Sequence, residues 1–187
     1  MPHPRAGKPI EAAPVKFIVA VLAHRDADFT RGPLRALERL LGPVDFHGEA
    51  HPFEMTDYYE DEMGPDLARA IVSFERLRIA TDLVRVKLAV AEIERSFEAD
   101  GGRMYNIDPG YIDFFKLVLA SFKEGPQKVY LGDGVWADPV MMYQEGAFHA
   151  LPWTFPDFKA GEYTEELVAI RRLYKSARRG IGHERSM

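Results

Sequence analysis

The stretch Val15-Lys-Phe-Ile-Val-Ala-Val-Leu22 is an apolar run rich in β-branched residues, and only Lys16 interrupts it. A short run of this composition is typical of a strand that is covered on both faces. We therefore expect residues 15–22 to form a buried central strand, with the rest of the fold arranged around it.

Helix and strand signals alternate beyond this strand. The clearest helix signal covers residues 82–97, where apolar side chains recur on one helical face and Gly101-Gly102 follows. A shorter helix is expected from Thr30, as its cap, to Leu41, before Gly42-Pro43. The expected elements are, in order, strand 15–22, helix 30–41, strand 44–53, strand 70–77, helix 82–97 and strand 103–107. This β-α-β-β-α-β order is that of a ferredoxin-like unit.

Residues beyond 107 have a different character. Strands are expected at 114–122, 128–131 and 135–143, with turns at Gly125-Pro126, Gly132-Asp133-Gly134 and Gln144-Glu145-Gly146. Pro139 lies inside one of these strands, which therefore is an edge strand or carries a bulge. Thr164 begins a final amphipathic helix. The predicted fold class is α+β: a ferredoxin-like unit extended by antiparallel β-hairpins, with a C-terminal helix.

The length of 187 residues fits a single domain. We place that domain at residues 15–177, between a disordered tail at 1–14 and a flexible tail at 178–187. The chain has no cysteine, which excludes disulfides, thiolate nucleophiles and cysteine-ligated metals.

The net charge of −5 disfavours a general nucleic-acid-binding protein, because such proteins are usually basic. No apolar run approaches the roughly 20 residues of a membrane-spanning helix, and the first residues do not resemble a secretion signal. We therefore expect a cytoplasmic protein without membrane contact. The sequence leaves its oligomeric state open.

Three segments hold most of the unusual chemistry: Phe53–Gly64, Asn106–Tyr111 and Leu151–Phe158. Each combines carboxylates and aromatic residues with proline or glycine. This composition suits loops that line a pocket better than the interior of a helix or strand. We expect the three segments to converge at one rim of the fold.

The first segment offers Asp57, Tyr58, Tyr59 and Glu62 as candidate site residues. Its clustered carboxylates could bind magnesium or calcium through oxygen. The alternative is a helix N-terminus capped by Thr56 or Asp57. The paired tyrosines favour ligand contact in addition, because a tyrosine presents both a flat apolar ring and a hydroxyl.

The second segment offers Asn106, Asp108 and Tyr111. Pro109-Gly110 has the chemistry of a type II turn, in which Asp108 would only brace the backbone. In the functional alternative, Asp108 ends a strand with a free carboxylate and acts as a base or metal ligand. Nearby, Lys116 is a candidate cation for an anionic ligand if it points inward, and Lys128 is the second choice.

The third segment, Leu151-Pro-Trp-Thr-Phe-Pro-Asp-Phe158, is held extended by its prolines. It either straps across the sheet and buries its aromatic residues or forms a pocket wall. Trp153 and Asp157 are its candidate ligand-binding residues.

The chain resembles a bacterial family, domain of unknown function 4416, on motifs that cover most of residues 15–175. These are Lys16-Phe17, Pro52-Phe53, Thr56-Asp-Tyr-Tyr59, Glu62-Met-Gly64, Ser73-Phe-Glu75, Asn106-Ile-Asp-Pro-Gly-Tyr111, Lys116-Leu-Val-Leu-Ala-Ser121, Tyr130-Leu-Gly-Asp-Gly134 and Leu151-Pro-Trp-Thr-Phe-Pro-Asp157. The resemblance implies no activity or cofactor. The chain departs from the family pattern at Ala137-Asp138-Pro139.

Some members of that family carry a label of GTP-binding protein. A phosphate loop of the form G-x-x-x-x-G-K-[ST] is absent from this sequence. Gly132-Asp133-Gly134 is followed by Val135-Trp136 and is interpreted as a hairpin turn. Switch-type GTP hydrolysis is therefore unsupported, whereas nucleotide binding by another mode stays open.

Our leading functional hypothesis is a small-molecule-binding domain with an acidic and aromatic pocket, whose ligand is a nucleotide or a phosphorylated metabolite. One alternative is an enzyme that uses a divalent metal such as magnesium on a phosphorylated substrate, with Asp108 and Glu62 as metal ligands or general base. Another is a protein-interaction module.

Overall fold

The structure is a computed structural model that describes residues 10–28, 32–56, 58–99 and 102–184. Its elements are β1 (Val15–His24), α1 (Leu34–Leu41), β2 (Val44–His47), β3 (His51–Pro52), α2 (Glu60–Met63), β4 (Leu67–Arg78), a 3-10 turn η1 (Ala80–Asp82), α3 (Leu83–Ser96), β5 (Tyr105–Ile112), β6 (Lys116–Ser121), β7 (Val129–Gly132), β8 (Val135–Gln144), β9 (Ala147–Ala150), α4 (Pro156–Ala160) and α5 (Thr164–Glu184).

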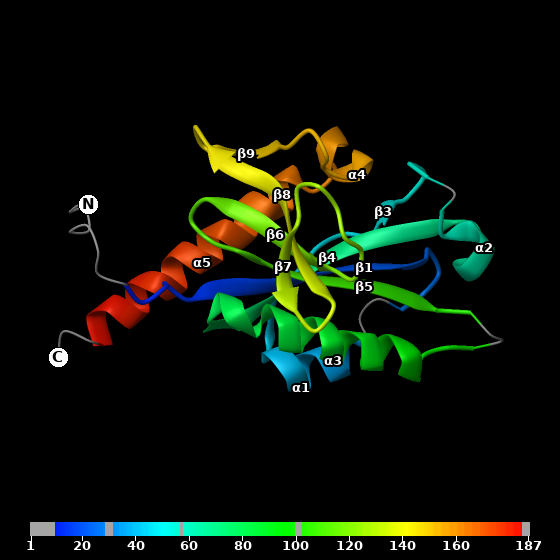
Figure 1. The fold of residues 1–187 in the computed structure, drawn as a ribbon, viewed down its shortest axis with the longest axis horizontal. Helices are drawn as coiled ribbons and strands as arrows, with labels where there is room; N and C mark the ends of the chain where they lie inside the picture. The colour runs from blue at the N-terminus through cyan, green and yellow to red at the C-terminus, as the bar shows by residue number, and fades with distance from the viewer. Residues whose placement is uncertain (1–9, 29–31, 57, 100–101, 185–187) are drawn as a thin grey trace.

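The strands form one nine-stranded sheet in the order β2-β4-β1-β5-β6-β8-β7, with β3 added beside β4 and β9 beside β8. Every pairing in the described part of the chain is antiparallel. Strand β1 lies inside the sheet between β4 and β5 (Figure 1), and its residues from Val15 to Ala23 are all buried. This confirms the predicted central strand.

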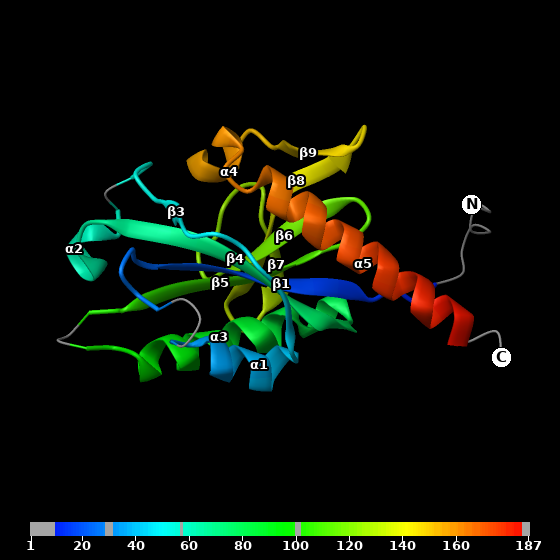
Figure 2. The ribbon, with the colours of Figure 1, turned by 180° about the vertical axis from the view of Figure 1, so that it is seen from behind.

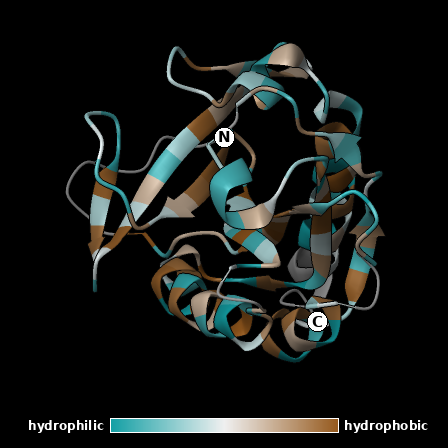
Figure 3. Ribbon diagram, turned by 90° about the vertical axis from the view of Figure 1, so that its right-hand side faces the viewer, coloured by the Kyte–Doolittle hydropathy of each residue, from teal (hydrophilic) through white to brown (hydrophobic). Residues whose placement is uncertain are grey.

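Helices cover both faces of the sheet (Figures 1 and 2). Because side chains alternate along a strand, Phe17 and Val19 of β1 pack in one apolar cluster with α1 and α3, whereas Ile18 packs in a second cluster with α5. The helices in Figure 3 carry bands of both brown and teal, the pattern of helices with one apolar face.

The α+β class and the C-terminal helix are confirmed, and the sheet is larger than predicted. The predicted strand at 44–53 is two short strands, β2 and β3. The predicted hairpin at Gly125-Pro126 is wrong, because β8 lies between β6 and β7 in the sheet. The predicted bulge in β8 is confirmed: Met141 lies opposite Leu117 and Pro139 opposite Val118, so the register shifts by one residue at Val140.

The predicted type II turn at Pro109-Gly110 is also wrong, because both residues lie inside β5. Pro109 pairs with Val19 and Gly110 with Ile18 of β1. A Cβ atom on Gly110 would lie 2.3 Å from the carbonyl oxygen of Val118. Glycine is therefore needed here for close strand approach rather than for a turn.

The ends of the chain are described in part. Residues 178–184, which the sequence analysis assigned to a flexible tail, continue helix α5. Most of the predicted tail at 1–14, and Thr30 as a helix cap, lie outside the described residues. Among the helices that the structure describes, none has both the length and the apolar character needed to cross a membrane.

Candidate functional site

Strands β5 and β6 separate soon after their hairpin. They pair only where Gly110–Ile112 faces Leu117–Leu119, so the first half of β5 has no strand on that side. Side chains of α3 take the place of the missing strand. Glu94 Oε1 accepts a hydrogen bond of 2.5 Å from the amide of Ile107, and Lys87 Nζ donates one of 3.3 Å to the carbonyl of Ile107. The open edge of β5 is thereby satisfied without a strand.

A cavity of about 250 Å³ lies at this separation. All three segments singled out in the sequence reach it. The first contributes Tyr58 and Tyr59, the second Asn106 and Asp108, and the third Phe155. Its remaining lining residues are Lys87, Glu94, Arg103, Leu119, Ala120, Ser121, Phe122, Lys123, Lys128 and Asp138.

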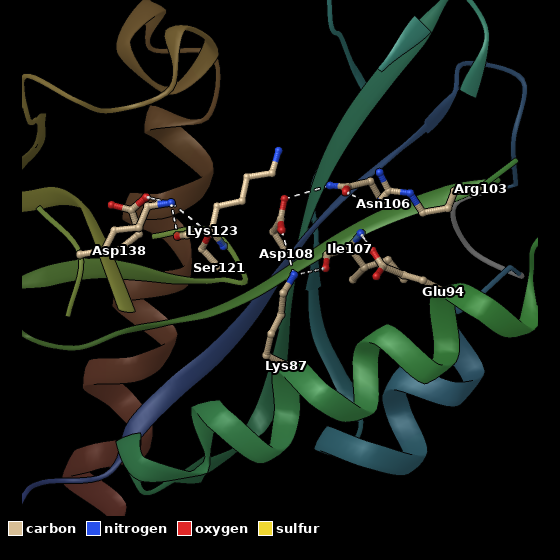
Figure 4. Close-up of polar contacts among 10 residues, drawn as sticks. Lys87, Glu94, Arg103, Asn106, Ile107, Asp108, Ser121, Lys123 and Asp138 are labelled. Atoms are coloured by element: carbon tan, nitrogen blue, oxygen red, sulfur yellow. Dashed lines mark hydrogen bonds and ion pairs between the residues drawn. The ribbon is translucent and has the colours of Figure 1, made fainter. Parts of the chain in front are cut away.

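Asp108 lies at the centre of the polar contacts (Figure 4). It accepts a hydrogen bond of 3.1 Å from Lys87 Nζ at one carboxylate oxygen and one of 2.9 Å from Asn106 Nδ2 at the other. Burial disfavours the ionised form, but the nearby Lys87 and Arg69 charges and these hydrogen bonds outweigh it and hold the pKa of Asp108 below its usual value. Asp108 is therefore a fixed carboxylate with both oxygens engaged.

Asn106 connects Asp108 to a second ion pair. Its Oδ1 accepts from Arg103 Nη1 at 2.9 Å, and Arg103 binds both oxygens of Glu62 at 2.6 and 2.7 Å. The hydrogen bonds from Arg103 lower the pKa of Glu62. Glu62, predicted as a metal ligand or base, does not line the cavity and is occupied by Arg103.

Glu94 is a cavity residue that the sequence analysis missed. It is 8% exposed, and burial raises the pKa of its carboxyl group above the usual value, although the amide of Ile107 and the charge of Lys87 act in the opposite direction. A signal for it exists in the sequence. Lys87 and Glu94 are seven residues apart, about two helical turns, so both project from one side of α3.

An aromatic wall closes another side of the cavity. The rings of Tyr58 and Tyr59 meet edge to face with centroids 4.9 Å apart, and Tyr59 meets Phe53 at 5.9 Å. Lys123 Nζ lies 4.2 Å from the centroid of the Tyr58 ring and also donates to its hydroxyl. Lys87 Nζ lies over the Phe122 ring, 5.2 Å from its centroid. Each ring thus lies beside a cation or another ring.

Lys128 lies on the β6–β8 side of the cavity. Its Nζ donates to Ser121 Oγ at 2.9 Å and lies 3.5 Å from Asp138 Oδ2. Figure 4 shows Ser121 and Asp138 on the opposite side of Asp108 from Asn106. Asp138, at the position where the chain departs from the family pattern, is buried and is a partner of this lysine.

Several predicted residues lie away from the cavity lining. Lys116 does not enter the cavity, because its Nζ binds Asp113 at 2.6 Å in the β5–β6 hairpin. Tyr111 packs beside Phe17, with ring centroids 6.4 Å apart. Asp57 lies outside the described residues.

The third segment is mainly a strap. Trp153 Nε1 donates to the carbonyl of Pro139 at 2.7 Å, and Thr154 Oγ1 donates to that of Val140. Together these bonds satisfy the part of β8 that lies between β7 and β9. Asp157 is buried and bonds to Arg69 and to the Tyr163 hydroxyl, so it anchors the strap rather than facing the cavity.

The first segment does not form the predicted helix cap. Helix α2 begins after Tyr59, and no side chain among the described residues caps it. Thr56 Oγ1 instead accepts a hydrogen bond of 3.1 Å from the amide of Tyr58, in the turn before the helix. This turn presents Tyr58, which is 60% exposed, at the cavity.

The described residues do not supply a magnesium site. No three histidine or carboxylate side chains among them gather around a common point. Asp108 is held by Lys87 and Asn106, and Glu62 is held by Arg103. Magnesium needs several oxygen ligands that are free to turn toward it, so this donor set does not fit.

A larger and more open groove, of about 1050 Å³, lies between the β2–β3 edge and α5. None of the predicted site residues that the structure describes lines it. Its main polar contacts are internal, since His51 lies 3.1 Å from Glu166 and 3.7 Å from Glu162. The smaller cavity is the better candidate because its cations, rings and carboxylates converge from segments far apart in the chain.

Comparison with known proteins gives a family and no activity. The model of a family described as domain of unknown function (DUF4416) matches residues 13–174, which is most of the chain. No curated protein and no solved structure matches the sequence.

Proposed function

Since this chain belongs to the family described as domain of unknown function (DUF4416), whose description carries no activity, we propose from the cavity itself that the protein binds a small anionic molecule between β5 and β6. The ligand class is a phosphorylated metabolite or the phosphate-bearing part of a nucleotide. The proposal takes the cavity as a binding site rather than as a metal-dependent catalytic centre.

One observation carries this proposal: the cavity holds a cation that no carboxylate among the described residues balances. Lys87 pairs with Asp108, Lys128 with Asp138 and Arg103 with Glu62. Within the part of the chain that the structure describes, the ammonium group of Lys123 contacts only the ring and hydroxyl of Tyr58. An anionic group on a ligand would supply the missing charge and form a charge-assisted hydrogen bond.

The aromatic wall supports a ligand with a carbon skeleton rather than a bare ion. Tyr58, Tyr59, Phe122 and Phe155 all line the cavity. The volume of about 250 Å³ is slightly below the usual range for ligand sites, roughly 300–1,000 Å³. It suits one phosphorylated sugar or acid better than a whole dinucleotide.

The test is a thermal-shift screen with nucleotides, sugar phosphates and inorganic phosphate, each with and without magnesium. It compares the natural chain with Lys123→Met and with the control Lys116→Met, whose lysine lies outside the cavity. A ligand at 100 times its Kd stabilises a protein by about 2.7 kcal/mol, which is readily measured.

We expect at least one phosphorylated compound to raise the Tm of the natural chain and of Lys116→Met, without needing magnesium, and to lose most of its effect on Lys123→Met. If no compound shifts the Tm, or if Lys123→Met responds as the natural chain does, the proposal is wrong.

We also propose that β1, α1, β2, β4, α3 and β5 together form a ferredoxin-like unit. Their order in the sheet is β2-β4-β1-β5, with α1 and α3 in one apolar cluster against it. This chain order and helix placement suit a split β-α-β arrangement. The proposal concerns the fold alone and implies no function. A crystal structure with another strand order would rule it out.

A further inference from the structure

Glu94 differs from every other carboxylate that lines the cavity. Asp108 and Asp138 each lie beside a lysine ammonium group. Glu94 forms no ion pair with any residue that the structure describes, and its one hydrogen bond there is the bond that Oε1 accepts from the amide of Ile107. Its second oxygen, Oε2, is free of partners within the same residues, and it is not among the atoms sealed from solvent. The carboxyl group therefore presents an unused oxygen at the cavity.

The charged groups around Glu94 come from two directions. Lys87 projects from the same helix, and Asp108 and Arg103 come from the β5 side. The neutral phenol of Tyr59 lines the same cavity from the turn before α2. The two cations are already bound to other carboxylates, Lys87 to Asp108 and Arg103 to Glu62. They offer Glu94 little direct compensation, so burial dominates and keeps its carboxyl group neutral to a higher pH than is usual for glutamate.

A neutral carboxyl group has a chemical capacity that a carboxylate lacks. It can donate a hydrogen bond from one oxygen while the other oxygen accepts one. The acceptor role of Oε1 is already taken by the Ile107 amide. Because Glu94 lines the cavity, the remaining oxygen, as a hydroxyl group, supplies a donor that could meet a carbonyl or hydroxyl oxygen of a ligand there.

We propose that Glu94 is a specificity-determining residue that donates a hydrogen bond to a neutral oxygen of the bound molecule. The ligand would then be an anionic metabolite with two features: a phosphate or carboxylate for Lys123, and a hydroxyl or carbonyl oxygen for Glu94. This inference rests on the proposed function and narrows it. It excludes bare inorganic phosphate as the preferred ligand.

The proposal requires that binding weakens as the pH rises. Above the pKa of Glu94 the hydroxyl donor is lost and a negative charge appears beside an anionic ligand. Where only the protonated form binds, Kd rises about tenfold for each further pH unit. Below that pKa, the ionisation of Glu94 should no longer make Kd change with pH.

The experiment measures Kd by calorimetric titration from about pH 4, below the ordinary glutamate pKa of about 4.3, to about pH 8.5. The two probes are glycerol 3-phosphate and inorganic phosphate. Four proteins are compared: the natural chain, Glu94→Gln, Glu94→Ala and Lys123→Met. Glu94→Gln keeps a hydrogen-bond donor and cannot ionise, so it is the matched control. Inorganic phosphate corrects for the titration of the phosphate group itself.

We expect the natural chain to bind glycerol 3-phosphate at least tenfold more tightly than phosphate at low pH and to lose this preference as pH rises. Glu94→Gln should keep the preference at every pH, and Glu94→Ala should have none. Equal behaviour of the natural chain and both Glu94 variants, with binding still lost in Lys123→Met, would overturn only the role of Glu94. Failure of the natural chain to bind either probe would overturn the proposed function together with this inference.

A measurement on the natural chain without ligand tests the proposal even if the variants fail to fold. The carboxyl carbon of Glu94, followed by NMR in the natural chain, should titrate above the ordinary glutamate value of about 4.3. Titration at or below that value would remove the neutral donor and contradict the proposal, whatever the variants do.

Discussion

At the scale of single residues, most buried charges in this molecule are compensated in pairs. Lys16 is fully buried, where its Nζ binds Asp45 at 2.5 Å and the carbonyl of Phe74 at 2.9 Å. Ser73 Oγ donates to the other oxygen of Asp45 at 2.7 Å. The lysine that interrupts the apolar run of β1 is thus held by a carboxylate from β2 and groups from β4. Removing only one partner of such a pair destabilises a protein strongly, because the other charge stays buried without compensation.

We therefore expect Asp45→Ala to destabilise the fold by about 3 kcal/mol, because it leaves a buried ammonium group without its carboxylate. The double variant Lys16→Met/Asp45→Ala should recover much of this loss. Urea unfolding measures both. A loss below about 1 kcal/mol in the single variant would mean that the ion pair does not matter for stability.

Asp108 should make stability depend on acid pH. Its pKa in the folded protein lies below the ordinary value for aspartate, so its stabilising effect is present above that ordinary value and is lost as pH falls through the folded pKa. We expect Asp108→Asn to be less stable than the natural chain at pH 7, and we expect this difference to be smaller at about pH 2.5, because the stabilising effect of the carboxylate is lost progressively in acid. Urea unfolding at both pH values provides the comparison. An equal difference at both would contradict the pairing with Lys87.

Glu94 should act in the opposite direction. Its raised pKa means that the neutral form stabilises the fold at low pH, and this contribution is lost as pH rises through the folded pKa. Glu94→Gln should therefore match the natural chain at about pH 4 and exceed it in stability at pH 8. If the natural chain were the more stable protein at pH 8, Glu94 would instead be a favourable carboxylate in the folded state.

At the scale of elements, local patterns predicted the helices better than the strand pairings. Helix α3 was expected at 82–97 and covers Leu83–Ser96, because its apolar stripe and the following glycines are local signals. The sequence predicts a turn at Pro109-Gly110, because proline followed by glycine is a local signal for a turn. What decides its conformation is distant: β1 on one side, and Val118 close to Gly110 on the other. Strand neighbours such as β6 and β8 depend on the whole fold in the same way.

The close approach at Gly110 gives a test at this scale. A methyl group there would meet the backbone of β6, so Gly110→Ala should destabilise the fold by about 1–3 kcal/mol. The control is Gly180→Ala in α5, where a Cβ meets no atom within 4 Å. That variant should be neutral or more stable by up to about 1 kcal/mol. Thermal unfolding of Gly110→Ala and Gly180→Ala measures both effects. Similar changes in stability at the two positions would contradict the packing described at β5.

At the scale of the whole molecule, the cavity depends on parts that are far apart in the chain. The sequence predicted that the three unusual segments would meet, and they all reach the cavity, but it did not show which side chains would face it. Lys116 and Trp153 were chosen for their chemistry and make local contacts instead, whereas Glu94 and Lys123 were missed. The reason is that the separation of β5 from β6 decides which side chains face the cavity. This separation is a tertiary feature that no short sequence pattern encodes.

A buried ion pair adds to the hydrogen bonds that hold the strap, residues 151–158, to the sheet. Arg69 of β4 binds Asp157, and its guanidinium lies 4.4 Å from the centroid of Phe53 and 5.9 Å from that of Phe158. Asp157→Ala should cost about 3–5 kcal/mol in urea unfolding, because the arginine loses its buried partner. Ligand binding should weaken as well, since the strap carries Phe155. Unchanged stability in this variant would show that the pair does not hold the strap in place.

The most direct test of the account is to map glycerol 3-phosphate on the isotopically labelled protein by NMR. If the cavity between β5 and β6 is the binding site, the amide signals that move should cluster at Tyr58, Asp108 and Lys123, and the same titration of Lys123→Met should leave them in place. Shifts confined to the groove beside α5, around His51 and Glu166, would contradict it, as would the absence of any shift.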